Sequence, residues 1–162
     1  IDVYSEEGEG STFNIYLPAS EKEVVEEGIK INSHEIQYGQ GTILLVDDEK
    51  MVTDVDQKML EKIGYRVLIA RSGREALDLY KKQKDQIDLV ILDMIMPGMG
   101  GGETFDRLKR IDDNVIVILS SGYSIDGQAK DILERGCIGF IKKPFTLEDL
   151  SIKVREALKK RN

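Results

Sequence analysis

The sequence predicts an α/β protein whose central sheet is parallel and covered by helices on both faces. Apolar runs rich in Ile, Val and Leu recur five times between residues 42 and 141. Stretches with the period of an amphipathic helix separate these runs. Continuous apolar runs are typical of strands buried on both faces, and regular alternation of strand and helix indicates parallel strands joined by helical crossovers.

Each element can be placed by its pattern and its end signals. The expected strands span residues 42–46, 66–70, 89–92, 115–119 and 138–141. The apolar positions of the helices are Val52, Val55, Met59 and Ile63 in the first, Ala76, Leu77 and Tyr80 in the second, and Leu147, Leu150, Val154 and Leu158 in the last. Ser72 with Glu75, and Thr146 with Asp149, have the spacing of capping boxes, which predicts where two of these helices begin.

Charge and composition exclude several function classes. Residues 1–40 hold nine Asp and Glu against two Lys, which accounts for the whole net charge of −7 in the 162 residues. The remainder is balanced and lacks the basic stripe of a nucleic-acid reader. No apolar run approaches the length of a membrane span. Cys137 is the single cysteine, which we expect to be a small buried hydrophobe in a reducing compartment, so we expect a cytoplasmic protein without direct membrane contact.

The leading segment differs from the rest. Residues 1–18 alternate with period two on either side of Gly8-Glu9-Gly10, which predicts a β-hairpin. Residues 19–41 form an acidic linker, in which 21–27 are either a short helix or solvated chain. We therefore expect three parts: a hairpin (1–18), a linker (19–41) and the α/β domain (42–162).

Acidic side chains stand at the ends of two strands. Asp47 and Asp48 follow the first strand, and Asp93 follows the run 89–92. In a doubly wound sheet, functional groups gather beyond the carboxyl ends of the strands. Two like charges ~4 Å apart repel by about 4 kcal/mol at an effective dielectric near 20, so such a cluster needs a counter-charge, for which Mg²⁺ is suited. A single strand-end Asp could simply cap the next helix.

Two further polar residues follow strands at the same predicted edge. Ser120 follows the fourth apolar run, and Lys143 follows the fifth. A hydroxyl and an ammonium directed at one point would bind a phosphoryl oxygen by hydrogen bond and charge.

Four segments of the chain resemble the signature segments of response-regulator receiver domains. The segments are Val46-Asp47-Asp48-Glu49, Leu92-Asp93-Met94-Ile95-Met96-Pro97-Gly98-Met99, Leu119-Ser120-Ser121-Gly122 and Lys142-Lys143-Pro144-Phe145. Their order and spacing match the family over residues 42–160. The resemblance implies a flavodoxin-like (βα)5 sheet in the order 2-1-3-4-5 and a role in a two-component His–Asp phosphorelay.

The resemblance also implies the role of each acidic residue and a magnesium cofactor. Asp93 would be the phosphoacceptor, attacking a phosphohistidine of a histidine kinase or a phosphotransfer domain. Asp48, Asp93 and the backbone carbonyl of Ile95 would bind Mg²⁺ directly, and Asp47 would act through water.

The remaining residues of the implied site act on the phosphoryl group and on the switch. Lys143 would pair with the phosphoryl group and form a cis peptide bond with Pro144. Ser120 would turn in to hydrogen-bond the phosphoryl group, and Phe140 would turn inward on activation.

The leading segment resembles the end of a histidine-kinase ATP-binding domain. Residues 5–18 carry the Gly-x-Gly-x-x-Phe pattern and a final Leu-Pro, with Ser11 where Thr is usual. A receiver that follows this segment, in a chain that begins with Ile, implies the C-terminal end of a hybrid sensor kinase. The chain itself would lack the phosphoaccepting His, since His34 lies in the linker, and most of the ATP site. We expect residues 1–18 either to dock on the receiver or to pair with a second copy; the last helix–strand–helix face is the other expected homodimer contact.

Three alternatives can be weighed against a phosphoacceptor. A Mg²⁺-dependent phosphatase of related fold usually has a second Asp two residues beyond the nucleophile, where this chain has Ile95. A transcription factor would need a DNA-binding domain, and the sequence stops at Asn162. A binding-only pseudo-receiver would not need the acids, Ser120 and Lys143.

Overall fold

The protein divides into two compact units, which are described separately. The structure is a computed structural model that describes residues 1–17, 35–122 and 127–160. The units are Ile1–Ser33 and His34–Asn162. The expected linker helix over 21–27, and His34, lie outside the described residues. No helix in the described ranges has both the length and the apolar character needed to cross a bilayer.

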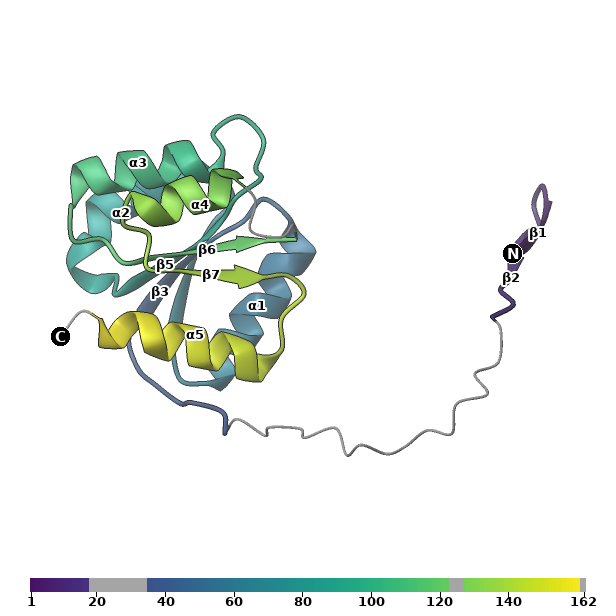
Figure 1. The fold of residues 1–162 in the computed structure, drawn as a ribbon, viewed down its shortest axis with the longest axis horizontal. Helices are drawn as coiled ribbons and strands as arrows, with labels where there is room; N and C mark the ends of the chain where they lie inside the picture. The colour runs from purple at the N-terminus through teal and green to yellow at the C-terminus, as the bar shows by residue number, and fades with distance from the viewer. Residues whose placement is uncertain (18–34, 123–126, 161–162) are drawn as a thin grey trace. The chain divides into compact units, whose positions relative to one another are not determined.

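The second unit is built on a five-stranded parallel sheet (Figure 1). Its strands are β3 (Thr42–Val46), β4 (Arg66–Ala70), β5 (Leu89–Asp93), β6 (Val117–Ser121) and β7 (Gly139–Lys142). They lie side by side in the order β4-β3-β5-β6-β7. Every residue of β3, β5 and β6 is buried, as expected of central strands in such a sheet. The predicted fold class and the strand order 2-1-3-4-5 are confirmed.

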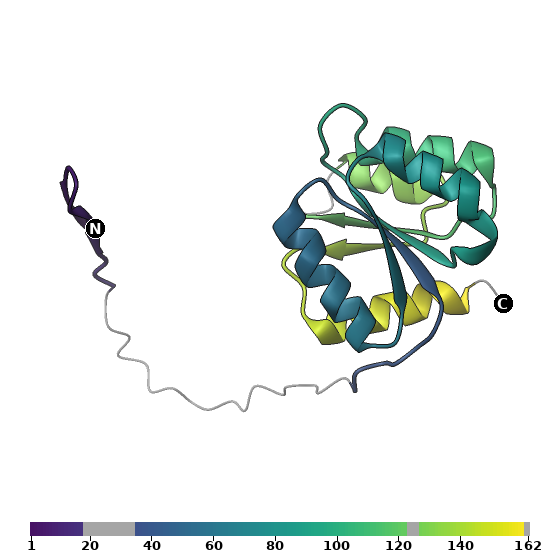
Figure 2. The same ribbon diagram turned by 180° about the vertical axis from the view of Figure 1, so that it is seen from behind.

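Helices cover both faces of the sheet (Figures 1 and 2). They are α1 (Lys50–Lys62), α2 (Gly73–Gln83), α3 (Gly101–Ile111), α4 (Gly127–Glu134) and α5 (Leu147–Lys159), with a short 3₁₀ turn, η1 (Lys84–Gln86). One hydrophobic core lies between the sheet and α2, α3 and α4, and a second lies between the sheet and α1 and α5. The Thr146–Asp149 capping box forms at the start of α5, and the Ser72 side chain accepts a hydrogen bond from the Glu75 N–H at the start of α2.

Three strands differ from the prediction by one or two residues at their ends: β7 begins and ends one residue later than expected, and the shifts in β6 and β5 bear on the site. The run 115–119 begins the strand too early: Val115 and Ile116 are buried but precede β6, which starts at Val117. Ser120 therefore does not follow a strand but lies within one. β5 likewise extends to Asp93, because Asp93 and Ser120 are paired in the parallel register. Apolar content located the buried segments, whereas the backbone pairing continues into the polar residues that follow.

The face of α1 that packs on the sheet also differs from the prediction. The expected stripe contained Val52, Val55, Met59 and Ile63. Ile63 is buried and Met59 packs against the core, as predicted, yet Val55 is 57% exposed. The buried positions within the helix are instead Thr53, Asp56 and Leu60. This stripe is shifted by one residue, which rotates the helix by about 100° relative to the prediction. α1 therefore presents apolar side chains outward and encloses a carboxylate.

Residues before β3 pack on the rest of the second unit. The Gln37 N–H donates to Ser151 Oγ at 3.1 Å, and Arg155 donates to the Tyr38 carbonyl at 2.8 Å. Ile36 packs against the core shared by α1 and α5. Part of the segment expected to be linker, after residue 35, thus lies against α5.

The first unit contains the predicted hairpin. β1 (Asp2–Glu6) pairs antiparallel with β2 (Gly10–Asn14), and Glu6 lies opposite Gly10. Gly8 and Gly10 both have positive φ, which the turn requires and which other residues rarely adopt. All ten residues of β1 and β2 are exposed, so this unit has no buried core of its own among its described residues.

Substitution by alanine should change the stability of the protein in opposite directions at two adjacent glycines at the start of α3. A Cβ on Gly101 would lie 2.5 Å from the carbonyl oxygen of Asp93, whereas a Cβ on Gly102 would meet nothing nearer than Ile132 at 3.4 Å. We expect Gly101→Ala to destabilise the protein by about 1–3 kcal/mol, because backbone at the end of β5 must move. Gly102→Ala is the control, expected to be neutral or to stabilise by about 0.5–1 kcal/mol, since Ala favours a helix. Urea unfolding measures both; equal effects would contradict this packing.

Candidate functional site

The predicted site residues from four segments meet at one edge of the sheet. Asp47 follows β3, Asp93 ends β5, and Ser120 lies opposite Asp93 in β6. Lys143 follows β7. All four stand at the carboxyl ends of parallel strands, so the parallel register alone brings them to the same edge.

Lys143 joins the acids of two strands. Its ammonium donates a hydrogen bond of 2.6 Å to Asp93 Oδ1 and another to Asp47 Oδ2. Asp47 and Asp93 are only 2% and 8% exposed, so neither charge is well solvated. Lys143 thus provides the counter-charge that the sequence argument required, and it joins Asp47 rather than Asp48 to Asp93.

The second oxygen of each acid is held by the backbone. The Ile95 N–H donates to Asp93 Oδ2 at 2.8 Å, and the Glu49 N–H donates to Asp47 Oδ1 at 2.8 Å. Both donors lie two residues beyond their acceptor, at the turn that follows each strand. Each carboxylate is therefore fixed through both oxygens before any ligand binds, which preorganises the site.

Burial and pairing change the proton affinities here. Burial raises the pKa of Asp93 above its usual value, against the hydrogen bond and the charge of Lys143, which lower it. Burial also acts to lower the pKa of Lys143, but its hydrogen bonds to Asp47 and Asp93 outweigh this and hold the pKa above its ordinary value. Lys143 is therefore charged at neutral pH.

The predicted metal ligands are hard oxygen donors. Asp47 and Asp93 present carboxylate oxygens at the edge, and Asp48, half-buried, follows Asp47 directly. In the described part of the chain, no three His, Cys, Asp or Glu side chains come close enough to hold a metal by themselves. The predicted set of two carboxylates, one backbone carbonyl and a water-bridged Asp47 does not require three. The donor chemistry fits Mg²⁺, which prefers a few oxygen ligands and retains waters.

The remaining predicted positions lie around this edge. Ser120 is buried in β6, and Phe140 is half-buried in β7, packed against the core beneath α4. The Lys143–Pro144 peptide bond is cis, as predicted. Cys137 is buried, with Sγ 3.0 Å from the Val117 carbonyl oxygen, as expected of a core residue.

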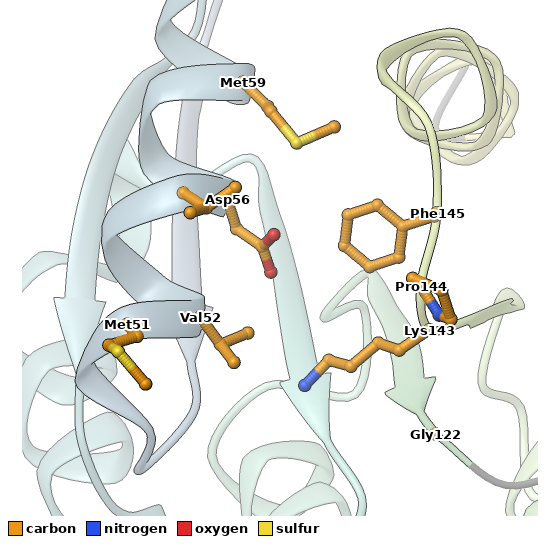
Figure 3. A pocket seen from close by; sticks show the side chains of 9 residues that line it. Met51, Val52, Asp56, Met59, Gly122, Lys143, Pro144 and Phe145 are labelled. Atoms are coloured by element: carbon orange, nitrogen blue, oxygen red, sulfur yellow. The ribbon is translucent and has the colours of Figure 1, made fainter. Parts of the chain in front are cut away.

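One buried acid near the site was missed by the sequence reasoning. Asp56 of α1 is 6% exposed and lies beside Lys143 in a pocket (Figure 3). Burial raises the pKa of Asp56 to about 6; the charge of Lys143 opposes this shift and that of Asp47 adds to it. One sequence signal could have revealed Asp56. It lies three residues after Thr53, so the two polar residues share one face of the helix between apolar positions.

This raised pKa makes stability depend on pH in a defined direction. Between about pH 4 and pH 6 the folded protein keeps the Asp56 proton that the unfolded chain has lost, so stability falls as pH rises through this window. We expect Asp56→Asn, without Mg²⁺, to be more stable than the wild type by about 1–2 kcal/mol at pH 7.5 and equally stable near pH 4. Asp54→Asn, also on α1, is the control. Urea unfolding across pH tests this; a constant difference at all pH values would contradict it.

The fold and the site together define a class of protein. A doubly wound sheet with two strand-end acids, a facing lysine and a strand-end serine at one edge is the arrangement of an aspartate phosphoacceptor domain. The family model for the response regulator receiver domain matches residues 43–155. The chain belongs to the response regulator receiver family.

Curated relatives agree with this family. Sporulation initiation phosphotransferase F of Bacillus subtilis is 36% identical over 118 residues, covering 73% of this chain and 90% of that protein. Sensor kinase CckA of Brucella abortus is 33% identical over 165 residues, covering 98% of this chain but only 18% of the kinase. The chain thus spans less than a fifth of one relative and nearly all of the other.

Solved structures agree as well. A response regulator receiver domain protein from Clostridium thermocellum has a TM-score of 0.72 and 31% identity, with 75% of this chain and 96% of that chain covered. CheY of Borrelia burgdorferi, solved in a complex with CheX, BeF₃ and Mg²⁺, has a TM-score of 0.66 and 29% identity, with 74% and 87% covered. The second unit is therefore a receiver domain of the two-component type, a phosphoacceptor family.

Proposed function

We propose that Asp93 is the phosphoacceptor of this receiver domain and that its donor is a phosphohistidine on a histidine kinase or phosphotransfer domain. The observation that carries the proposal is the Lys143 ammonium bonded to both Asp47 and Asp93 at the carboxyl edge of the sheet. This arrangement holds a nucleophilic carboxylate next to a cation that can pair with a phosphoryl oxygen.

The reaction is an in-line displacement at phosphorus. A carboxylate oxygen of Asp93 forms the new bond to phosphorus while the bond from phosphorus to the imidazole nitrogen breaks, and the imidazole retains the electron pair and takes up a proton. Lys143 pairs with the developing phosphoryl charge. The Ile95 N–H, 2.8 Å from Asp93 Oδ2, keeps the carboxylate aligned.

Asp48, Asp93 and the Ile95 carbonyl would hold Mg²⁺, with Asp47 acting through water. Bound Mg²⁺ supplies positive charge that offsets the acids and the incoming phosphoryl oxygens. Ser120, buried and paired with Asp93 in the register of β5 and β6, would turn to hydrogen-bond a phosphoryl group on Asp93. Phe140, half-buried in the next strand, is the residue that changes position with it.

The wider setting is the C-terminal part of a hybrid sensor kinase in the cytoplasm. The match to CckA covers 98% of this chain, so it extends beyond the receiver to the leading segment. The pairing of β1 and β2 supports the proposal that residues 1–18 are the last strands of an ATP-binding domain, which the linker (19–41) and the receiver (42–162) would follow.

The exposed hairpin is proposed to contact either the receiver or a second copy of the chain. Val3, Tyr4 and Phe13 are each more than half exposed on an unpaired two-stranded ribbon, which invites pairing. Deleting residues 1–18 should lower either the particle mass or the melting temperature. Light scattering and thermal unfolding measure these; if both stay unchanged, any homodimer must use the α4–β7–α5 face instead.

Phosphoryl uptake tests the proposed function. Incubation with acetyl phosphate and Mg²⁺ should raise the intact mass by one phosphoryl group, and chelation of Mg²⁺ should prevent the gain. An unchanged mass in the presence of Mg²⁺ would overturn the proposal.

A further inference from the structure

A pocket of about 540 Å³ lies between α1 and the segment that joins β7 to α5 (Figure 3). On the α1 side it is lined by Met51, Val52, Val55 and Met59, and on the other side by Pro144 and Phe145. Met51 is 81% exposed and Val55 57%. Apolar side chains thus surround a hollow at the surface. Met59 and Phe145 also pack against the core between the sheet and α1 and α5, whereas Met51 and Val55 are exposed beside the hollow.

Asp56 contributes a carboxyl group to the lining of this apolar pocket. It is more than nine-tenths buried, and its carboxyl group points into the space between α1 and Phe145 (Figure 3). No residue of the described ranges gives Asp56 a hydrogen bond or an ion pair, and its oxygens still reach the pocket surface. The nearby cation, Lys143, is already bonded to Asp47 and Asp93. A buried carboxylate without a partner is costly, so the pocket is complementary to a cation.

The walls indicate which cation fits. An apolar pocket with a carboxylate on one side and an aromatic ring on the other suits a side chain that carries a cationic group at the end of a long aliphatic chain. A guanidinium can bind a carboxylate through two parallel hydrogen bonds and stack on the ring of Phe145, and it is more weakly hydrated than an ammonium. Arginine meets all three requirements.

The position of the pocket indicates which protein supplies that arginine. Lys143 lines the pocket and also bonds Asp93, so the pocket and the phosphoacceptor share a residue. A protein that brings a phosphohistidine to Asp93 must cover this edge. We propose that the pocket receives an arginine side chain of the phosphohistidine donor and that Asp56 is a specificity-determining residue for that donor. This inference rests on the proposed function.

Methionine-methyl NMR tests the pocket directly, with N-acetyl-L-arginine N-methylamide as the probe. Met51 and Met59 line the pocket, whereas Met94, Met96 and Met99 lie elsewhere and serve as internal references. We expect saturable shifts of the Met51 and Met59 signals, no such shifts with the neutral citrulline analogue, and about tenfold weaker binding to Asp56→Asn. Asp56→Glu should retain part of the affinity, and the signal dispersion of each variant shows whether it is folded. Absent shifts, or equal binding of citrulline, would overturn the proposal.

The kinetics of phosphotransfer from the donor test the second part of the proposal, that Asp56 is a specificity-determining residue. With a phosphohistidine protein that phosphorylates the wild-type chain, Asp56→Asn should raise KM about tenfold and leave kcat within about twofold, because a docking contact is lost. A lower kcat with unchanged KM would instead mean that Asp56 acts on Asp93 and would overturn the assignment. Acetyl phosphate uptake, measured in parallel on the wild type, separates the two failures: no uptake refutes the proposed function, whereas uptake without arginine binding refutes only this inference.

Discussion

Replacing Asp93 by Asn is expected to abolish phosphoryl uptake. The carboxamide keeps the size of the side chain and can still accept the Ile95 N–H, but it lacks the charged oxygen that attacks phosphorus. The fold should survive, since Lys143 keeps its bond to Asp47 and one of two buried like charges is removed. Intact-mass measurement after incubation with acetyl phosphate and Mg²⁺ should show no gain.

A matched surface acid separates this effect from a general change of charge. Asp113 has a side chain that is 96% exposed, and it lies in the loop that leads from α3 to the amino end of β6, whereas the acids lie at the carboxyl ends of strands. Asp113→Asn should take up phosphoryl groups like the wild type. If Asp93→Asn still gained one phosphoryl group at the wild-type rate, the assignment of the acceptor would be wrong.

Replacing Lys143 by Met is expected to reduce both stability and phosphoryl uptake. The substitution leaves Asp47 and Asp93 buried without their shared cation. Breaking a buried ion pair from one side costs about 3–5 kcal/mol, and partial exposure of Lys143 reduces this to about 2–3 kcal/mol. Because Mg²⁺ can replace the lost charge, it should stabilise the variant more than the wild type. Urea unfolding with and without Mg²⁺ measures both effects.

The neighbouring lysine provides the control for this variant. Lys142 is exposed at the end of β7, so Lys142→Met should change stability by no more than about 0.5 kcal/mol and leave phosphoryl uptake intact. Equal stability of Lys143→Met and the wild type in the absence of Mg²⁺ would show that the bridge between Asp47 and Asp93 contributes nothing.

Much of this fold could be predicted from the sequence because its central strands are buried on both faces. Such strands are continuous apolar runs, as in 42–46, and they were located to within two residues. The convergence of Asp47, Asp93 and Lys143 was also predictable, since parallel strands bring their carboxyl ends to one edge whatever the details of packing. The agreement of four separate segments supported the family before any geometry was known.

The rotation of helix α1 about its axis and the hydrogen-bond partners of Lys143 could not be predicted from the sequence. In helix α1, periodicity alone favoured the apolar stripe that contains Val55. The helix instead buries the adjacent stripe, in which two polar residues, Thr53 and Asp56, accompany Leu60. With the predicted stripe turned inward, Asp56 would not face the sheet, and it was not among the predicted site residues. The bond from Lys143 to Asp47 was not predicted either, because the resemblance assigned Lys143 to the phosphoryl group alone.

The phosphatase alternative gains no support from the site. The position two residues beyond Asp93 is Ile95, which is 61% exposed and contributes its backbone N–H rather than a proton donor for a leaving group. A general acid is needed for turnover of a phosphate ester, so the geometry favours a stable phosphoacceptor.

The central claim is that the new bond forms on the carboxylate of Asp93. Borohydride reduction of the phosphorylated protein converts an aspartyl phosphate to homoserine, and tandem mass spectrometry of the resulting peptides locates it. We expect homoserine at position 93 alone, formed only when Mg²⁺ and the phosphodonor were both present. Homoserine at position 47 or 48, or a gain in mass without homoserine at 93, would contradict the account.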